Sequence, residues 1–308
     1  MLEWSKNFEP ETLGNVAVLY GGWSNERSVS LESGTCVLNA CKRLGVNVVG
    51  FDLACPSDLF KIPAEDIDLC LLALHGGDGE NGRVQSVLDL LGIPYVGSGV
   101  RASAVCMNKV AARLICKAVG VPVVPWQEFA HDQAPYQPEF NFPICLKPVD
   151  GGSSIGVSKI KDLDHWLSVR ESLADGQWML EPWFSGVDHF VGILGNAVLP
   201  PLELSLPSGQ FFDYDNKYSC PKSVKYEVVE NKNIEKWMLA AYSSLGCRHY
   251  ARADFITIGA RSWFLEMNTL PGLSPICLLP RQSKAAGLGY DDFVKVLLQS
   301  YAMEIECA

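Results

Sequence analysis

Residues 250–268 read YARADFITIGARSWFLEMN, and this stretch decides how the second half of the chain folds. Its alternation of apolar and polar residues predicts two strands, Tyr250–Ile258 and Ser262–Asn268, which a short turn at Gly259-Ala260 joins into a hairpin. Successive side chains of a strand point to opposite faces. Each strand therefore presents a pair of polar side chains on one face, and the register decides whether the pairs meet.

The register that unites these pairs places Arg252 opposite Asn268, and Asp254 opposite Glu266. A turn of only two residues would shift the pairing by one residue and send Glu266 to the opposite face. The shared face therefore requires a three-residue turn, Gly259–Arg261, or a β-bulge within the hairpin.

The shared face would carry a metal-binding set. Asp254 and Glu266 supply carboxylates and Asn268 supplies an amide oxygen, the hard oxygen ligands that suit Mg²⁺, with the guanidinium of Arg252 beside them. The alternative for this segment is a cluster of surface ion pairs on an edge hairpin.

A second feature is the glycine-rich stretch Gly151-Gly-Ser-Ser-Ile-Gly156, which follows a predicted strand, Pro143–Pro148, that carries Lys147. Glycines let backbone N–H groups approach phosphate oxygens closely, and serine hydroxyls add donors. The stretch is neither a Walker A loop nor a Gly-x-Gly-x-x-Gly fingerprint, so neither of those folds is implied. A Gly/Ser hairpin without a ligand is the alternative interpretation.

Two further segments have weaker signals. Glu181 lies near the end of a predicted strand, Trp178–Trp183, and a short linker separates it from a second acid, Asp188, so the two acids could bind an adenosine by its amino group and ribose hydroxyls. The segment Phe211–Tyr218 is aromatic yet polar, as a lid loop over a site would be. Both segments could equally be surface features without a ligand.

Elsewhere the chain divides into a doubly wound start and a mixed end. Strands separated by helices up to about residue 100 indicate a parallel sheet with helical crossovers. A single helix is expected over Ala102–Val119 and a loop over Ala130–Phe142; later segments favour antiparallel pairing. The pattern predicts an α/β and α+β chain of three lobes.

Composition narrows the class of protein. The 308 residues are 48% hydrophobic and 19% charged, as in soluble globular proteins, and no apolar run approaches the ~18 residues of a membrane helix. The net charge of −10 argues against a duplex nucleic-acid partner. The acidic opening does not resemble a secretory signal, and eleven scattered cysteines without a Cys-x-x-Cys pair favour reduced thiols in the cytoplasm.

Seven stretches, taken in their order, resemble the D-alanine–D-alanine ligase family of the ATP-grasp superfamily over residues 15–301. They are Ser24–Gly34, Leu74–Gly82, Gly92–Gly99, Met107–Lys109, Lys147–Gly156, Tyr214–Tyr218 and Glu266–Gly272. The resemblance implies an ATP-grasp fold with an N-terminal extension (1–14), an N-terminal α/β substrate-binding domain (15–100), a small central α+β subdomain (101–180) and a larger antiparallel C-terminal catalytic domain (181–308).

The resemblance also implies the reaction. The carboxylate of a first D-alanine would attack the γ-phosphate of ATP, and the amine of a second D-alanine would displace phosphate from the acyl phosphate. ADP, phosphate and D-alanyl-D-alanine for peptidoglycan precursor synthesis would result. Two Mg²⁺ ions, replaceable by Mn²⁺, a homodimer, and neither a nucleic-acid nor a membrane partner are expected on the same ground.

ATP would lie between the central and C-terminal lobes in this resemblance. The phosphates would contact Lys109, Lys147 and, from the lid, Lys217, which could also reach the second substrate. Glu181 would bind the adenine amino group. The residues implied for the rest of the nucleotide and for the metal are Pro182 and Phe184 by their backbone, Asp188 at the ribose, and Asp254, Glu266 and Asn268 at the Mg²⁺ ions.

The substrate residues follow from the same resemblance. Glu26 would hold the ammonium group of the first D-alanine in a network with Ser153 and Tyr218. Arg252 and the N–H group of Gly272 would stabilise the oxyanion of the tetrahedral intermediate. His75, Cys277 and Leu278 complete the implied substrate site.

Three residues depart from the family pattern. Asp188 replaces the usual ribose-binding glutamate, and Pro182 stands where lysine or glutamate is frequent. Cys277 replaces a serine that binds the second carboxylate, and a thiol is a weaker donor, so the choice of second substrate stays open. Tyr218 favours an amine acceptor. The alternatives are a ligase that uses D-serine, D-lactate or L-amino acids, and an inactive relative that binds nucleotide.

Overall fold

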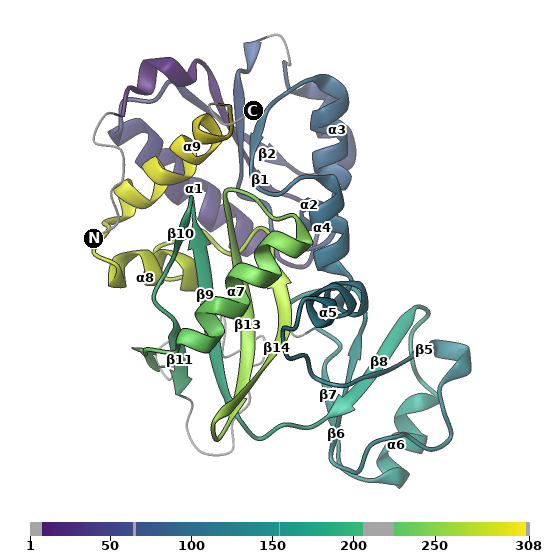
Figure 1. Cartoon of the computed structure of the whole chain (residues 1–308). Helices are drawn as coiled ribbons and strands as arrows, with labels where there is room; N and C mark the ends of the chain where they lie inside the picture. The colour runs from purple at the N-terminus through teal and green to yellow at the C-terminus, as the bar shows by residue number, and fades with distance from the viewer. Residues whose placement is uncertain (1–7, 64–65, 154, 206–224, 306–308) are drawn as a thin grey trace.

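The computed structural model describes residues 8–63, 66–153, 155–205 and 225–305. Three sheets follow one another along the chain, and each has its own helices (Figure 1). The first sheet forms the upper part of the molecule in that view, the third lies below it, and the second projects at the lower right.

The first sheet is parallel, in the order β2-β1-β3-β4. Strands β1 and β3 are buried along most of their length because helices cover both faces, which explains their continuous apolar sequences. The doubly wound start is thereby confirmed. Its elements are η1 (Pro10–Leu13), β1 (Val16–Gly21), α1 (Arg27–Arg43), β2 (Val48–Leu53), η2 (Pro56–Lys61), β3 (Leu69–Leu72), α2 (Gly77–Glu80), α3 (Arg83–Leu91) and β4 (Tyr95–Val96).

The single helix expected over residues 102–119 is wrong, because the structure contains two helices, α4 (Val100–Met107) and α5 (Lys109–Ala118). Asn108 between them has an extended backbone (φ −87°, ψ 104°), and its side chain accepts a hydrogen bond of 2.8 Å from the backbone N–H of Ala111. An asparagine in this position is a strong N-cap. The break makes Lys109 the first residue of α5.

The second sheet is antiparallel, in the order β5-β8-β6-β7. Strand β5 was not predicted, and it runs into the first residue of the segment expected as a loop. The apolar side chains between the sheet and α6 form a small core around Trp166. The elements are β5 (Gln127–Ala130), η4 (His131–Gln133), β6 (Ile144–Pro148), β7 (Ser158–Ile160), α6 (Leu163–Arg170) and β8 (Gln177–Pro182).

The third sheet has the order β12-β11-β9-β13-β14, with β10 paired to β9. Helices α4, α5 and α7 cover one of its faces, where Phe255 and Phe264 are fully buried. Figure 1 shows α7 lying across the strands. The elements are β9 (Val187–Leu194), β10 (Ala197–Val198), β11 (Leu202–Ser205), β12 (Lys225–Val228), α7 (Lys232–Leu245), β13 (Tyr250–Ile258) and β14 (Arg261–Asn268).

The register predicted for the β13–β14 hairpin is confirmed: Arg252 pairs with Asn268, and Asp254 with Glu266. Beyond Asp254 the pairing shifts by one residue, so a β-bulge at Leu265 supplies the extra residue and the turn keeps two residues. The core explains the bulge. Phe264 and Met267 both pack beneath the sheet, and only an extra residue between them lets Glu266 face the other way.

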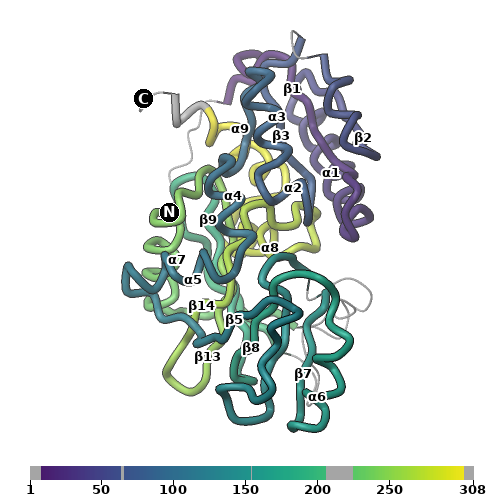
Figure 2. The backbone as a smooth tube through the Cα atoms, turned by 90° about the vertical axis from the view of Figure 1, so that its right-hand side faces the viewer, coloured from purple at the N-terminus to yellow at the C-terminus, as the bar shows by residue number. Residues whose placement is uncertain are grey.

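The end of the chain returns to the first sheet. Helix α8 (Leu278–Ala285) contacts β9, and α9 (Tyr290–Ile305) packs on α1 and β4. Apolar side chains of α9 belong to the same buried cluster as β1 and β3, and both views show α9 beside the first sheet (Figures 1 and 2). The domain limits predicted from the sequence stay predictions.

Candidate active site

The face of the third sheet opposite α4, α5 and α7 carries the polar side chains of the hairpin. The guanidinium of Arg252 donates to both carboxylate oxygens of Asp254, from Nε at 2.7 Å and from Nη2 at 2.9 Å. The same guanidinium lies over the ring of Phe190, 5.5 Å from its centroid. Asp254 is buried, so the ion pair is shielded from water. Arg252 thus stands beside the predicted metal ligands.

The residues present fit a magnesium ion. Asp254 and Glu266 are direct cross-strand neighbours, and Asn268 follows on the same face. The amide nitrogen of Asn268 is buried and has no hydrogen-bond partner among the described residues. Across those residues, no three His, Cys, Asp or Glu side chains converge as a metal cluster. The set therefore depends on the amide oxygen and on ligands from outside the protein, as is usual for Mg²⁺ bound with phosphates.

Lys109 reaches this face from the start of α5. Its Nζ atom donates to the carbonyl of Gly151 at 2.5 Å and lies 3.7 Å from Oε2 of Glu266. Burial lowers the pKa of Lys109, while the nearby charge of Glu266 opposes the shift. The lysine therefore connects the glycine-rich loop of the second sheet with the carboxylates of the third.

Glu181 on β8 is held by two cations. Its Oε1 atom lies 2.7 Å from Nζ of Lys147 on β6, and its Oε2 atom lies 2.7 Å from Nη1 of Arg113 on α5. Burial acts to raise the pKa of Glu181, but the charges and hydrogen bonds of Lys147 and Arg113 outweigh it and leave the pKa lowered. Glu181 is thus a buried carboxylate. Arg113 was missed from the sequence, where it looks like one more basic residue of an amphipathic helix.

The other residues implied for the base and ribose follow Glu181 along the chain. Pro182 ends β8, and the ring of Phe184 in the following linker packs on Trp263 of β14 at a centroid distance of 5.0 Å. Asp188 pairs with Ile256 across β9 and β13, two residues from Phe190, and therefore belongs to the polar face. The end of β8, the following linker and the start of β9 thus carry the implied base and ribose contacts.

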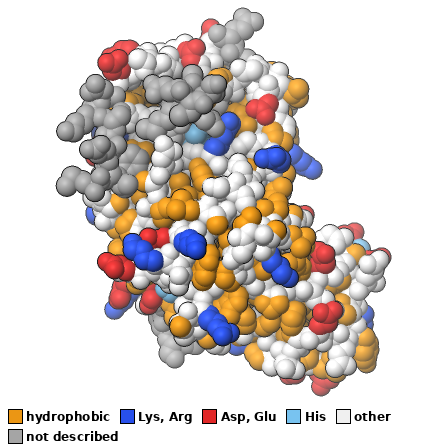
Figure 3. Space-filling view, viewed as in Figure 1, with side chains coloured by type: hydrophobic (Ala, Val, Ile, Leu, Met, Phe, Trp, Pro, Cys, Tyr) orange, Lys and Arg blue, Asp and Glu red, His pale blue; other side chains and the backbone are white. Residues whose placement is uncertain are grey.

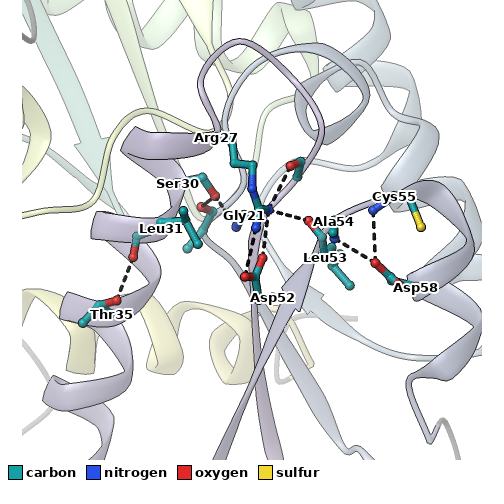
Figure 4. A network of polar contacts seen from close by, with 12 residues as sticks. Gly21, Arg27, Ser30, Leu31, Thr35, Asp52, Leu53, Ala54, Cys55 and Asp58 are labelled. Atoms are coloured by element: carbon teal, nitrogen blue, oxygen red, sulfur yellow. Dashed lines mark hydrogen bonds and ion pairs between the residues drawn. The ribbon is translucent and has the colours of Figure 1, made fainter.

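Glu26 lies in the connection between β1 and α1, immediately before the helix, and is buried. Arg27 anchors this connection: its guanidinium donates to the carbonyls of Gly22 (3.1 Å) and Leu53 (2.9 Å) and pairs with Asp52 (2.8 Å). Figure 4 shows this guanidinium pointing towards Asp52 and Leu53 on the neighbouring strand. The network fixes the backbone that presents Glu26.

The glycine-rich loop meets Glu26 from the opposite side. A Cβ atom added to Gly152 would lie 3.3 Å from Oε1 of Glu26, although 126 positions separate the two residues in the sequence. Ser153 follows in a left-handed backbone conformation (φ 51°), which is uncommon outside glycine. Glu26 and the glycine-rich loop are therefore neighbours, and the network of Glu26 with Ser153 and Tyr218 stays a prediction. Lys217 and Tyr218, like Ser154, lie outside the described residues.

His75 follows β3 and lies where the first sheet meets the loop after β14. Its Nδ1 atom lies 2.9 Å from the carbonyl of Leu270 and its Nε2 atom 2.9 Å from the hydroxyl of Ser33. Burial lowers its pKa to about 4, so the ring is neutral at physiological pH. Because Leu270 precedes Gly272 by two residues, the histidine also ties the first sheet to the loop that carries the predicted oxyanion donor.

Gly272 and Cys277 touch across that loop. A Cβ atom on Gly272 would lie 2.5 Å from the Sγ atom of Cys277, so only glycine fits there. The thiol lies 3.3 Å from the hydroxyl of Ser274, and burial raises its pKa. Cys277 is the N-cap position of α8 and Leu278 its first residue. Cys277, one of the two implied contacts of the second substrate, is thus adjacent to Gly272.

Glu80, at the end of α2, is a site residue that the sequence reasoning missed. Burial raises its pKa well above the ordinary value and the charge of Glu26 adds to the shift, whereas Arg252 opposes it. The pKa values of His75 and Cys277 also respond to the charge of Arg252. The sequence could have indicated Glu80, because this residue lies within the family-like stretch Leu74–Gly82. The charge of Arg252 therefore influences the pKa of groups in both halves of the chain.

Comparisons with known proteins find relatives over most of the chain. The family models described as D-ala D-ala ligase C-terminus and N-terminus match residues 115–299 and 57–98. The chain is 35% identical to the D-alanine–D-alanine ligase of Ectopseudomonas mendocina, over 95% of this chain and 96% of that protein. The chain belongs to the D-alanine–D-alanine ligase family. A second D-alanine–D-alanine ligase, from Francisella philomiragia, is 37% identical over 92% of this chain and 97% of its own length.

Solved structures of family members have the same fold. The D-alanine–D-alanine ligase of Bacillus anthracis complexed with ATP superposes with a TM-score of 0.81 at 30% identity, covering 94% of this chain and 97% of that one. VanG, a D-Ala:D-Ser ligase from Enterococcus faecalis, superposes with a TM-score of 0.78 at 25% identity, covering 94% and 99%. The ATP-grasp fold predicted from the motifs is confirmed.

Proposed function

We propose that this protein joins two D-alanine molecules to D-alanyl-D-alanine and converts ATP to ADP and phosphate. The observation that carries the proposal is the polar face of the β13–β14 hairpin, where Arg252 stands beside Asp254 and Glu266 and within reach of Lys109. Membership of the D-alanine–D-alanine ligase family supports the choice of substrate.

ATP would bind between the second and third sheets. Lys109 and Lys147 would pair with its phosphates, and Glu181 would accept a hydrogen bond from the adenine amino group. Asp254, Glu266 and Asn268 would hold Mg²⁺, which when bound neutralises phosphate charge. Phe184, packed on Trp263, would hold the base-binding linker in place. The solved structure of the Bacillus anthracis enzyme complexed with ATP supports this part of the proposal.

The two substrates would react in succession. Glu26 would hold the ammonium group of the first D-alanine while its carboxylate attacks the γ-phosphorus and ADP leaves. The amine of the second D-alanine would then attack the carbonyl carbon, and phosphate would leave. Arg252 and the N–H of Gly272 would stabilise the oxyanion of that step, a type of contact whose loss costs about 10²–10³ in rate.

Phosphate release from Mg-ATP tests this proposal. We expect release with D-alanine alone, none with L-alanine or without amino acid, and D-alanyl-D-alanine in the product by mass spectrometry. The nearest alternative is a mixed ligase, the activity that the structural neighbour VanG is named for. Turnover only when D-serine or D-lactate accompanies D-alanine would support that alternative. Folded protein that binds ATP yet releases no phosphate with any pair would contradict both.

Two subsidiary expectations belong to the same proposal. The family resemblance implies a homodimer, which light scattering coupled to size-exclusion chromatography would test. Among the described residues no helix is both long and apolar enough to cross a membrane. On the face of the molecule that Figure 1 shows, Lys and Arg side chains are scattered among hydrophobic ones (Figure 3).

A further inference from the structure

We propose that Arg113 is a positioning residue for adenine recognition, which acts by holding the carboxylate of Glu181 when Lys147 turns to the phosphates. The inference rests on the proposed function, because it takes Glu181 as the group that accepts the adenine amino N–H. The contacts of Arg113 with Glu181 and Leu265 carry the rest of the inference.

Arg113 lies in the middle of α5, one helical turn after Lys109, so both side chains project from the same side of the helix. Its side chain is completely buried. Nη1 lies 2.7 Å from Oε2 of Glu181, and Nε donates to the carbonyl of Leu265 at 3.1 Å. A buried guanidinium is stable only with such partners. Arg113 therefore has a defined position between the second and third sheets.

Glu181 has one cation on each oxygen in this structure, Lys147 on Oε1 and Arg113 on Oε2. The two cations are not equivalent. Lys147 is also a phosphate-binding residue in the proposed function, and the phosphates and the amino group lie at opposite ends of a nucleotide. Once Lys147 serves the phosphates, Arg113 is the cation that remains to balance the buried carboxylate.

The guanidinium of Arg113 has one N–H group available for Glu181 when Lys147 binds the phosphates. Its Nη2 atom is buried and has no hydrogen-bond partner among the described residues. Buried donors without a partner are rare and call for an explanation. A guanidinium can bind a carboxylate through two parallel hydrogen bonds, so Nη2 can follow the carboxylate when Lys147 leaves. A lysine at position 113 could not form two parallel hydrogen bonds with the carboxylate, because its charge sits on a single ammonium group.

The contact with Leu265 gives the same guanidinium a second anchor. Leu265 is the bulge residue that turns Glu266 onto the polar face. The guanidinium is therefore fixed against the third sheet at the point where the metal ligands are set, and from there it holds a carboxylate of the second sheet. Adenine binding and the position of Glu266 are thus connected through one side chain.

The test compares ATP with purine riboside triphosphate, which lacks only the exocyclic amino group. Calorimetry with Mg²⁺ measures the affinity of both nucleotides for the wild type and for Arg113→Met, Arg113→Lys and Glu181→Gln. Lys117→Met is the matched control, because it removes an exposed cation from the same helix. Thermal unfolding of every variant reports whether it folds, and Arg113→Lys preserves the charge should Arg113→Met not fold.

The wild type and Lys117→Met should prefer ATP by about 10- to 100-fold, the effect of one hydrogen bond to a charged group. Arg113→Met and Glu181→Gln should each bring the ratio of affinities towards one, and their combination should add nothing further. Arg113→Lys should keep part of the preference. A weaker affinity for both nucleotides with an unchanged ratio would reduce Arg113 to a structural role and overturn the inference.

The outcome is separable from that of the proposed function. The affinity ratio is measured without amino acid and does not depend on turnover. A chain that never makes D-alanyl-D-alanine, but loses its preference for ATP on substitution of Arg113, would contradict the proposed function and support the inference. A wild type that binds both nucleotides equally would overturn the inference, whatever its ligase activity.

Discussion

Asp254 and Glu266 face each other across the β13–β14 hairpin even though its turn has only two residues. The pairing exists because Leu265 is bulged out of the ladder, and the bulge is needed because Phe264 and Met267 must both reach the core beneath the sheet. Hydrophobic packing on one face of the sheet therefore brings two carboxylates together on the other.

Substitution of Glu266 by Gln should raise the Mg²⁺ concentration needed for half-maximal activity. The neutral amide removes one of the two adjacent carboxylates, and even outer contacts of a metal site typically change affinity or activity by about 10- to 100-fold. Activity titrated with Mg²⁺ at saturating ATP measures the shift. Glu227→Gln, on the exposed strand β12 of the same sheet, is the control. An unchanged Mg²⁺ requirement in Glu266→Gln would contradict the metal assignment.

Substitution of Gly152 by Ala should weaken the binding of D-alanine more than that of ATP. The new methyl group would lie 3.3 Å from Oε1 of Glu26, so the carboxylate has to move by a few tenths of an ångström. Displacements of this order matter for a group that orients a substrate. Steady-state kinetics should show a higher KM for D-alanine at unchanged thermal stability. Gly289→Ala, where the methyl group meets nothing nearer than 3.6 Å, should behave as the wild type.

Alkylation of Cys277 should inactivate the enzyme slowly at neutral pH and faster as the pH rises. Burial raises the pKa of this thiol, and the thiolate is the reactive form. D-alanine should protect it, because Cys277 touches Gly272 in the proposed second-substrate site. Peptide mass spectrometry locates the modification, and a Cys55→Ser background removes an exposed competing thiol. Complete labelling of Cys277 with full activity would rule out its place in the site.

His75 should make the protein less stable in mild acid. Its pKa in the folded protein is about 4, lowered by burial, whereas an exposed histidine titrates near 6.5. Between these values the unfolded chain binds a proton that the folded one does not, so stability falls as the pH decreases from 6.5 towards 4. Urea unfolding should show that the wild type loses about 2 kcal/mol more than His75→Asn between pH 7 and pH 5.

The matched control for this pH effect is His131→Asn, at a partly exposed position paired with Asp175. That variant should keep the wild-type difference between the two pH values. Equal losses in the wild type and in His75→Asn would mean that the ring of His75 is protonated within the folded protein.

Most of the site was visible in the sequence because its motifs are local. The alternation of β13 and β14 places the four polar residues of the hairpin on shared faces, and this follows from strand geometry alone. The stretches around Glu26, His75 and Gly152 were recognised by their residue order. Glu80 lay inside one of them and was overlooked, because a single acid in a short helix carries no periodic signal.

Several features could not be read from the sequence because they depend on partners far along the chain. Arg113 meets Glu181 across 68 positions, and nothing in the pattern of α5 distinguishes it from a surface residue. The helix break at Asn108 was hidden by helix-forming residues on both sides. Strand β5 exists because β8 offers it an edge to pair with.

The sequence by itself therefore determined the periodicities, the turns and the faces on which the reactive side chains lie, since these depend on backbone geometry within a few residues. Only the tertiary structure decided between a longer turn and a bulge at Leu265, and only it brought Gly152 against Glu26 and Arg113 against Glu181. The physical reason is packing. The close packing of the buried faces of the three sheets and their helices decides which distant segments meet. Local conformational preferences do not specify these contacts.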